Sequence, residues 1–293
     1  SFGFINQQCK EVEYYKWDFG DGQFLKQIDT KGSPKKTIEH TYDCAGIYNT
    51  KLYGYSSYDN VQGEKEGKEC GSDSLTKQIT ILPVPELKEL DDIKVCKNTK
   101  IDKVVLADLD VCEYDWFDSE SMTCKKTDVC ALLGKKVAHK FDVTVTGDDI
   151  GLQLTYGITY ENLTEIPEFT AVNEDNVEKR ARICITPYNE DGCIGQPMCY
   201  DIIVYPSAKI TDPQDYKYCH DNKTNIAGFK ANITGVTFEW EVKDGDWAAI
   251  GMTSNSGTGN LPNFTAKNTT KAPIIVTISV RGNSVNCEGD DSE

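Results

Sequence analysis

Residues 14–22 read YYKWDFGDG, and no other stretch says more about the fold. Tyr15, Trp17 and Phe19 alternate with polar residues, so one face of a strand carries aromatic side chains that require a core. The GDG that follows predicts a tight turn, because glycine adopts positive φ and aspartate oxygens accept backbone N–H bonds. An aromatic strand that ends in such a turn favours a half-buried β-sheet.

The composition indicates a β protein of an oxidising compartment. Of 293 residues, 39% are hydrophobic, 15 are tyrosines and 23 are glycines. The net charge of −16 repels phosphate backbones, so no nucleic acid partner is expected. Twelve cysteines without paired C-x-x-C spacing favour disulfides over zinc and predict an extracellular location. No apolar run reaches the roughly 18 residues of a membrane span, so no membrane insertion is expected.

Strand-like segments recur, and none holds a helical pattern over three turns. They cover residues 14–19, 48–53, 138–145, 181–186, 237–242 and 274–280. Prolines mark two seams, at Pro83–Pro85 and at Pro206, since proline ends strands and stiffens linkers. We therefore predict an all-β chain of three tandem immunoglobulin-like sandwiches in an extended array, with domains at 1–83, 84–206 and 207–293.

The second and third domains share an internal repeat. The matching pairs are Cys96 with Cys219, Trp116 with Trp240, Ile150 with Ile250, Phe169 with Phe264, Asn173 with Asn268, and Cys193 with Cys287. Ile150 follows Trp116 by 34 residues, whereas Ile250 follows Trp240 by 10, so the second domain carries an insertion at about 118–140. The first domain is expected to lack its first strand, and the third its last, as in a segment cut from a longer chain.

The quoted stretch resembles the PKD domain, whose WDFGDG turn precedes an H-x-Y-x-x-x-G-x-Y pattern. Here that pattern runs from His40 through Tyr42 and Gly46 to Tyr48. The repeat resembles the PKD-like modules of Bacteroidota surface proteins, such as the gliding-motility adhesin SprB, which the type IX system exports. The resemblance implies an adhesive or structural segment of a large secreted protein, anchored at the outer membrane through other parts of the chain.

No catalytic residues are predicted, and the chain is not expected to be an enzyme. His40, His139 and His220 stand apart, and the sequence has no HExxH, G-x-S-x-G or P-loop motif. The expected partners are neighbouring repeats, with surface polysaccharide or other cell-surface proteins as further candidates. The alternative is an accessory, carbohydrate-binding or protein-binding region of a secreted multidomain hydrolase.

Calcium is the one cofactor for which candidate ligands exist. Asp18 and Asp21 share a turn, and Asp108 and Asp110 flank a short loop. Calcium needs six to eight oxygen ligands, and no D-x-[DN]-x-[DN]-G loop occurs. Asx turns and solvated surface explain the same aspartates, so the main expectation is no cofactor.

Four disulfides are predicted. Cys219 and Cys287 are the third domain's only cysteines, the repeat then pairs Cys96 with Cys193, the insertion suggests Cys124–Cys130, and adjoining loops suggest Cys9–Cys70. Cys184 and Cys199 lie on neighbouring strands, and Cys44 is a candidate for an interdomain bond; Cys112 is left unassigned. Asp73-Ser74-Leu75 resembles a Bacteroidota O-glycosylation site, which makes Ser74 the acceptor.

Overall fold

The computed structural model describes residues 14–28, 38–57, 69–211, 214–284, 286–287 and 291–292. Nearly all of its elements are β-strands, and all strand pairs but β15–β5 among those described are antiparallel, which confirms the predicted all-β, immunoglobulin-like class. The chain forms two compact units. Unit 1 comprises Ser1–Lys88, Ala107–Lys140 and Thr186–Gln196, and unit 2 comprises Glu89–Leu106, Phe141–Ile185 and Pro197–Glu293. The domain boundaries at 83 and 206 stay predictions.

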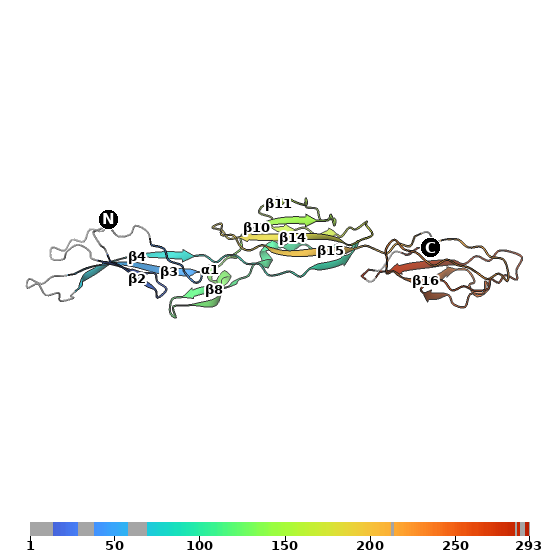
Figure 1. The fold of residues 1–293 in the computed structure, drawn as a ribbon, viewed down its shortest axis with the longest axis horizontal. Helices are drawn as coiled ribbons and strands as arrows, with labels where there is room; N and C mark the ends of the chain where they lie inside the picture. Colours follow the sequence, from blue (N-terminus) through green and yellow to red (C-terminus); the bar gives the residue numbers. More distant parts are fainter. Residues whose placement is uncertain are drawn as a thin grey trace, which may run out of the picture. The chain divides into compact units, whose positions relative to one another are not determined.

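The first sheet, which we call module 1, contains the aromatic strand (Figure 1). Its order is β2-β1-β3-β4, with β1 at Tyr14–Asp18, β2 at Phe24–Ile28, β3 at Gly46–Ser57 and β4 at Glu69–Ile81. Trp17 of β1 lies between β2 and β3 in the antiparallel register. The expected absence of a first strand concerns residues 1–13, which lie outside the described residues.

Module 2 is built on a five-stranded sheet of order β11-β10-β14-β15-β5. The strands are β5 (Ile93–Cys96), β10 (Lys140–Gly147), β11 (Thr159–Tyr160), β14 (Lys179–Tyr188) and β15 (Met198–Tyr205). Figure 1 shows β10, β14 and β15 side by side. Alternate side chains of β10 are buried, as the half-buried sheet of a sandwich requires.

Short elements complete module 2. They are β6 (Lys100–Ile101), β7 (Val104–Val105), the 3-10 helix η1 (Leu106–Leu109), β12 (Glu165–Ile166) and β13 (Phe169–Thr170). The pairs β6–β13 and β7–β12 form two small antiparallel ladders. Ile101, Ile166 and Phe169 on these ladders are buried, as are the inward residues of β10 and β14.

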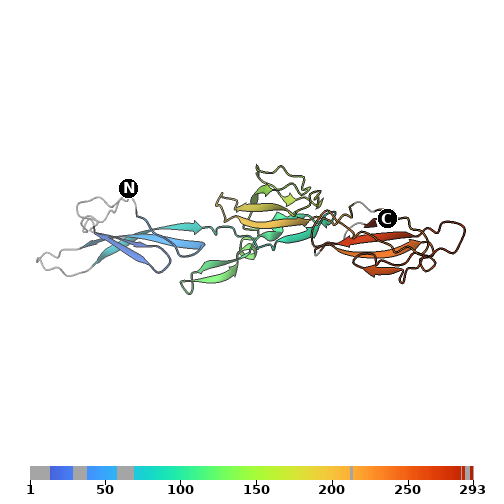
Figure 2. The same cartoon turned by 45° about the vertical axis from the view of Figure 1, so that its right-hand side comes forward.

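Module 3 has a four-stranded sheet of order β17-β16-β18-β19, best seen in Figure 2. Its strands are β16 (Thr237–Asp244), β17 (Ser256–Thr258), β18 (Thr277–Asn283) and β19 (Asp291–Ser292). The expectation that this module lacks its last strand stays a prediction: a two-residue strand, β19, pairs with β18 through Val280 and Ser292. Trp240 lies in the core with Met252 and Val280.

A hairpin and a short helix separate β7 from β10. They are β8 (Glu113–Asp118), β9 (Thr123–Asp128) and α1 (Val129–Leu133). Trp116 lies on β8, whereas the module 2 counterpart of β16 is β10. A positive-φ glycine stands at the end of β10 (Gly147) and directly after β16 (Gly245), and each lies close to backbone atoms at the start of the neighbouring strand or just before it. The match of Trp116 with Trp240 is therefore wrong, and the extra segment precedes this strand instead of following it.

The rest of the repeat has a common backbone in modules 2 and 3. The N–H of Asn98 donates to the carbonyl of Ala171 at 2.8 Å, and that of Asp221 donates to Ala266 at the same distance. Asn98 and Asp221 both have positive φ, of 67° and 62°. The same turn therefore follows Cys96 in module 2 and Cys219 in module 3.

The close approach at Gly147 predicts a large cost for an added methyl group. A Cβ there would lie 2.3 Å from the Arg180 carbonyl oxygen, whereas a Cβ on Gly157 meets nothing within 4 Å. The φ angles are similar, at 98° and 82°, so the backbone strain of alanine is shared. Gly147→Ala should therefore lower the free energy of unfolding by about 1–3 kcal/mol more than Gly157→Ala, measured by urea denaturation. Equal losses would contradict the packing.

Candidate functional site

The turn after β1 uses its own aspartates. The Oδ1 of Asp18 accepts the N–H of Gly20 at 2.9 Å, and the Oδ1 of Asp21 accepts the N–H of Gln23 at 2.9 Å. The Oδ2 of Asp21 lies 2.7 Å from the Nε2 of His40 in a largely buried pair. Three of the four carboxylate oxygens therefore already have protein partners.

A row of stacked rings leads away from this turn. The His40 ring lies parallel to Phe19 at 3.8 Å between centroids, and Tyr42 meets it edge-on at 4.6 Å. Tyr48 follows at 4.1 Å from Tyr42, and Phe117 of β8 at 4.4 Å from Tyr48. Burial raises the pKa of Tyr48. His40 thus contributes packing and a hydrogen bond with Asp21 to a structural cluster.

Asp110 is the most deeply buried carboxylate of the described residues, with 1% of its surface exposed. Its Oδ2 accepts the N–H of Val137 at 2.9 Å and its Oδ1 accepts the N–H of Ala138 at 3.1 Å. Desolvation raises the pKa of this carboxyl, and the two backbone donors oppose that rise. The carboxylate therefore serves as the acceptor for two buried N–H groups that would otherwise be unpaired.

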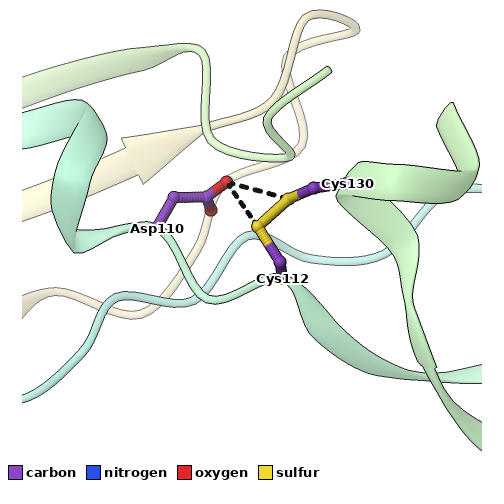
Figure 3. A group of neighbouring side chains, drawn as sticks. All are labelled: Asp110, Cys112 and Cys130. Carbon is purple, nitrogen blue, oxygen red and sulfur yellow. Dashed lines mark hydrogen bonds between the residues drawn. A yellow bond between two sulfur atoms is a disulfide. The ribbon is translucent and has the colours of Figure 1, made fainter. Parts of the chain in front are cut away.

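The same carboxylate faces a disulfide (Figure 3). Cys112 and Cys130 are bonded, and the Asp110 Oδ2 lies 4.0 Å and 3.6 Å from their sulfur atoms. Disulfide sulfur carries no hydrogen, so these are van der Waals contacts. The three residues also form the one cluster of metal-ligand type found among the described residues. Metal binding requires thiolates, which the bonded sulfurs do not supply.

The β8–β9 hairpin packs against module 1 within unit 1. The Phe117 N–H donates to the Ala45 carbonyl at 2.8 Å, and Ala45 and Trp116 share a buried cluster. A disulfide joins Cys44 of module 1 to Cys124 of β9, with 6.1 Å between the Cα atoms. Both cysteines belong to unit 1, so the interdomain character expected for a Cys44 bond stays a prediction.

The predicted bond Cys124–Cys130 is wrong. Cys124 lies opposite Phe117 near the hairpin tip, while Cys130 follows the other end of β9. Four strand residues span about 13 Å, beyond the roughly 7 Å between Cα atoms that a disulfide allows. Cys130 bonds instead to Cys112, which precedes the first strand of the hairpin.

The predicted bonds Cys96–Cys193 and Cys219–Cys287 are also wrong, because the structure joins Cys96 to Cys287. Cys96 lies beside Tyr205, near the start of β14, whereas Cys193 follows the end of β14. A ten-residue strand spans about 33 Å, so Cys96 and Cys193 cannot meet. Cys193 and Cys219 are free thiols.

The other predicted sites have separate outcomes. Cys184 and Cys199 lie opposite each other on β14 and β15 and are bonded, which confirms that suggestion. Cys9 lies outside the described residues, so Cys9–Cys70 stays a prediction. Ser74 is exposed on β4, opposite Tyr53, and its glycosylation stays a prediction.

The four calcium candidates are not brought together as one ligand set. Asp18 and Asp21 belong to the turn of module 1, Asp108 is exposed on η1, and Asp110 is buried against backbone donors. Sequence reasoning missed the acceptor role of Asp110. It also missed the Cys44–Cys124 link, because nothing local in the sequence signals contacts across 80 residues.

Carbohydrate stacking on an exposed aromatic finds little support at Trp247. This side chain is half-buried and packs against the core of module 3.

No helix in the described part of the chain has the length and apolar character of a membrane span.

No family model matches the sequence, and no curated protein is significantly similar to it. Solved structures of similar chains include the fibronectin(III)-like modules of Clostridium thermocellum CbhA, at 14% identity and TM-score 0.21, covering 74% of this chain and 88% of that one. The FN1–FN3 domains of chicken CNTN1 have 8% identity and TM-score 0.28, covering 96% and 87%. Extracellular domains 3–5 of Drosophila OTK have 10% identity and TM-score 0.28, covering 98% and 86%.

The buried position of Asp110 predicts a measurable cost for removing its charge. Asp110→Asn replaces one accepting oxygen by a donor NH₂ group and leaves a buried N–H unpaired, so the free energy of unfolding should fall by about 1–3 kcal/mol. The matched control is Asp108→Asn at the exposed neighbour, which should change it by less than about 0.5 kcal/mol. Chemical denaturation measures both, and equal effects would argue against the acceptor role.

The occupied oxygens of Asp18, Asp21 and Asp110 predict that calcium does not stabilise the fold. Thermal melts with a calcium chelator and with added Ca²⁺ should have the same midpoint. A midpoint that rises with Ca²⁺ and no longer rises in Asp21→Asn would contradict this expectation and identify the turn as a binding site.

Proposed function

We propose that the chain is a structural segment of a larger secreted cell-surface protein and acts as a stiff spacer in adhesion. The single observation that carries the proposal is the pattern of cross-links. Cys44–Cys124 fastens module 1 to the hairpin that follows β7, and Cys96–Cys287 fastens module 2 to module 3. A spacer needs such restraint, because modules joined only by a short linker move relative to one another by default.

The chemistry of the described residues supports a structural role over catalysis. His40, which contacts the turn after β1, lies against the rings of Phe19 and Tyr42 and is paired with Asp21. The buried Asp110 accepts backbone N–H groups and faces a closed disulfide. Each of these groups is engaged in holding the fold, and a catalytic acid or nucleophile has to face a substrate instead.

Four disulfides among the described residues support a location outside the cytoplasm, since oxidising compartments preserve such bonds. The resemblance of the WDFGDG turn and of the repeat supports a finer proposal. On it, the parent protein is a Bacteroidota surface adhesin with PKD-type modules, exported by the type IX system and used in gliding motility. Its partners are then neighbouring repeats and surface polysaccharide or protein.

Small-angle X-ray scattering tests the spacer role. The variant with Cys96→Ser and Cys287→Ser should give a broader distribution of interatomic distances than the unaltered chain, because the junction of modules 2 and 3 is released. The variant with Cys184→Ser and Cys199→Ser is the matched control: it removes a disulfide within module 2 and should leave the distribution unchanged.

Superimposable distributions for the first variant and the unaltered chain would contradict the spacer role. Binding of the intact chain to a glycan array would instead favour the alternative, an accessory binding region of a secreted hydrolase.

A further inference from the structure

Cys219 is an exposed free thiol at a position whose counterpart in the preceding module is bonded. The counterpart is Cys96, and the two share their local backbone. The N–H of Thr99 donates to the Cys96 carbonyl at 3.2 Å, and that of Asn222 donates to the Cys219 carbonyl at 3.1 Å. The next residue along pairs with the phenylalanine-threonine segment in both modules, as Lys100 with Thr170 and Lys223 with Thr265.

Cys287 likewise has a counterpart in Cys193: Cys287 lies in the loop after β18, and Cys193 lies in the loop after β14. In module 2, Asn189 donates its N–H to the Cys193 carbonyl at 3.0 Å and accepts the Cys193 N–H through Oδ1 at 2.8 Å. In module 3, Ser284 donates to the Cys287 carbonyl at 2.8 Å and accepts the Cys287 N–H through Oγ at 3.0 Å. The two loops therefore present their cysteines in the same way. We call this segment the closing loop.

These equivalences show that the Cys96–Cys287 bond joins two different positions of successive modules. In module 2, Cys96 at the end of β5 and Cys193 in the closing loop lie at opposite ends of the sheet, and Cys219 and Cys287 are their counterparts in module 3. The observed bond joins the first cysteine of module 2 to the closing loop of module 3. Cys219 is the equivalent of Cys96 in module 3. By the same pairing, its partner is the closing-loop cysteine of the module that follows.

We propose that Cys219 forms a disulfide with the closing-loop cysteine of another module of this repeat, joined in tandem after module 3. The proposal rests on the spacer function and extends it, because every junction between such modules then carries the same covalent link. The exposure of Cys219 and the bond made by Cys96 at the equivalent position together carry it.

Bond formation is a two-electron oxidation. Two thiols lose two protons and two electrons, and one S–S bond forms. The electrons pass by thiol–disulfide exchange to an oxidant of the disulfide class, such as oxidised glutathione or a disulfide oxidoreductase, which is released as two thiols.

A tandem extension tests the proposal. The full chain is lengthened by a second copy of residues 207–293, in which Cys219→Ser removes the copy's own competing thiol. After oxidation with glutathione, peptide mapping without reduction should show the native Cys219 linked to a Cys287 peptide, together with the unchanged Cys96–Cys287 link. Alkylation of Cys219 should fall at least about tenfold relative to the unextended chain, since tethering gives mM effective concentrations.

The matched control carries Cys287→Ser in the added copy, which should restore full alkylation of Cys219. The proposal is overturned if Cys219 stays alkylated in the extended chain, or if it bonds to Cys193 or to the Cys287 of its own module. A disulfide-linked dimer of the unextended chain that disappears in Cys219→Ser would assign the closing loop to a second copy and also overturn the tandem arrangement.

The disulfide map is independent of the scattering test for the spacer role. Failure of the Cys219 link with a broadened Cys96→Ser, Cys287→Ser distribution would refute this inference alone. Formation of the link with unchanged scattering would refute the spacer role alone.

Discussion

The length of a β-strand keeps Cys96 and Cys193 of module 2 apart, and this constraint decides how modules 2 and 3 are joined. β14 has ten residues and spans about 33 Å, whereas a disulfide requires Cα atoms within about 7 Å. A cysteine beside one end of the sheet therefore bonds only to something that lies beyond that end. Cys96 meets this condition with Cys287, and Cys193 and Cys219 are the free thiols of the part of the chain that the structure describes.

Modules 2 and 3 each bury a core of their own, and a disulfide joins them. Inward residues of β10 and β14 are fully buried within module 2, and Trp240 is buried within module 3. The core of module 1 is different, because Ala45 shares a buried cluster with Trp116 of the β8–β9 hairpin. A disulfide that closes a loop of 191 residues contributes about 5 kcal/mol in the chain-entropy model and fixes the junction as well.

Local sequence patterns predicted the strands well. The predictions that failed concern features that depend on contacts between residues far apart in the sequence. The alternation in 138–145 and 181–186 predicted β10 and β14, because period-two burial is a property of each strand alone. Trp116 carries the same alternation, yet it belongs to a hairpin that packs on Ala45, and nothing near it in the sequence signals that contact. The cysteine pairs were predicted on the assumption that each bond lies within one module, whereas Cys96–Cys287 joins two modules. Asp110 reads as a surface carboxylate because its two N–H partners follow 27 and 28 residues later.

The Cys96–Cys287 bond also sets how the chain responds to being pulled. Tension applied at the two ends crosses from Cys44 to Cys124, runs back along the backbone to Cys96 and leaves through Cys287. The backbone between Cys124 and Cys287 forms a longer parallel path, so it carries none of this tension while the bonds are intact. Most of modules 2 and 3 is thereby shielded from mechanical unfolding. Reduction of the Cys96–Cys287 disulfide would expose both modules to the tension, so that they could unfold and lengthen the chain.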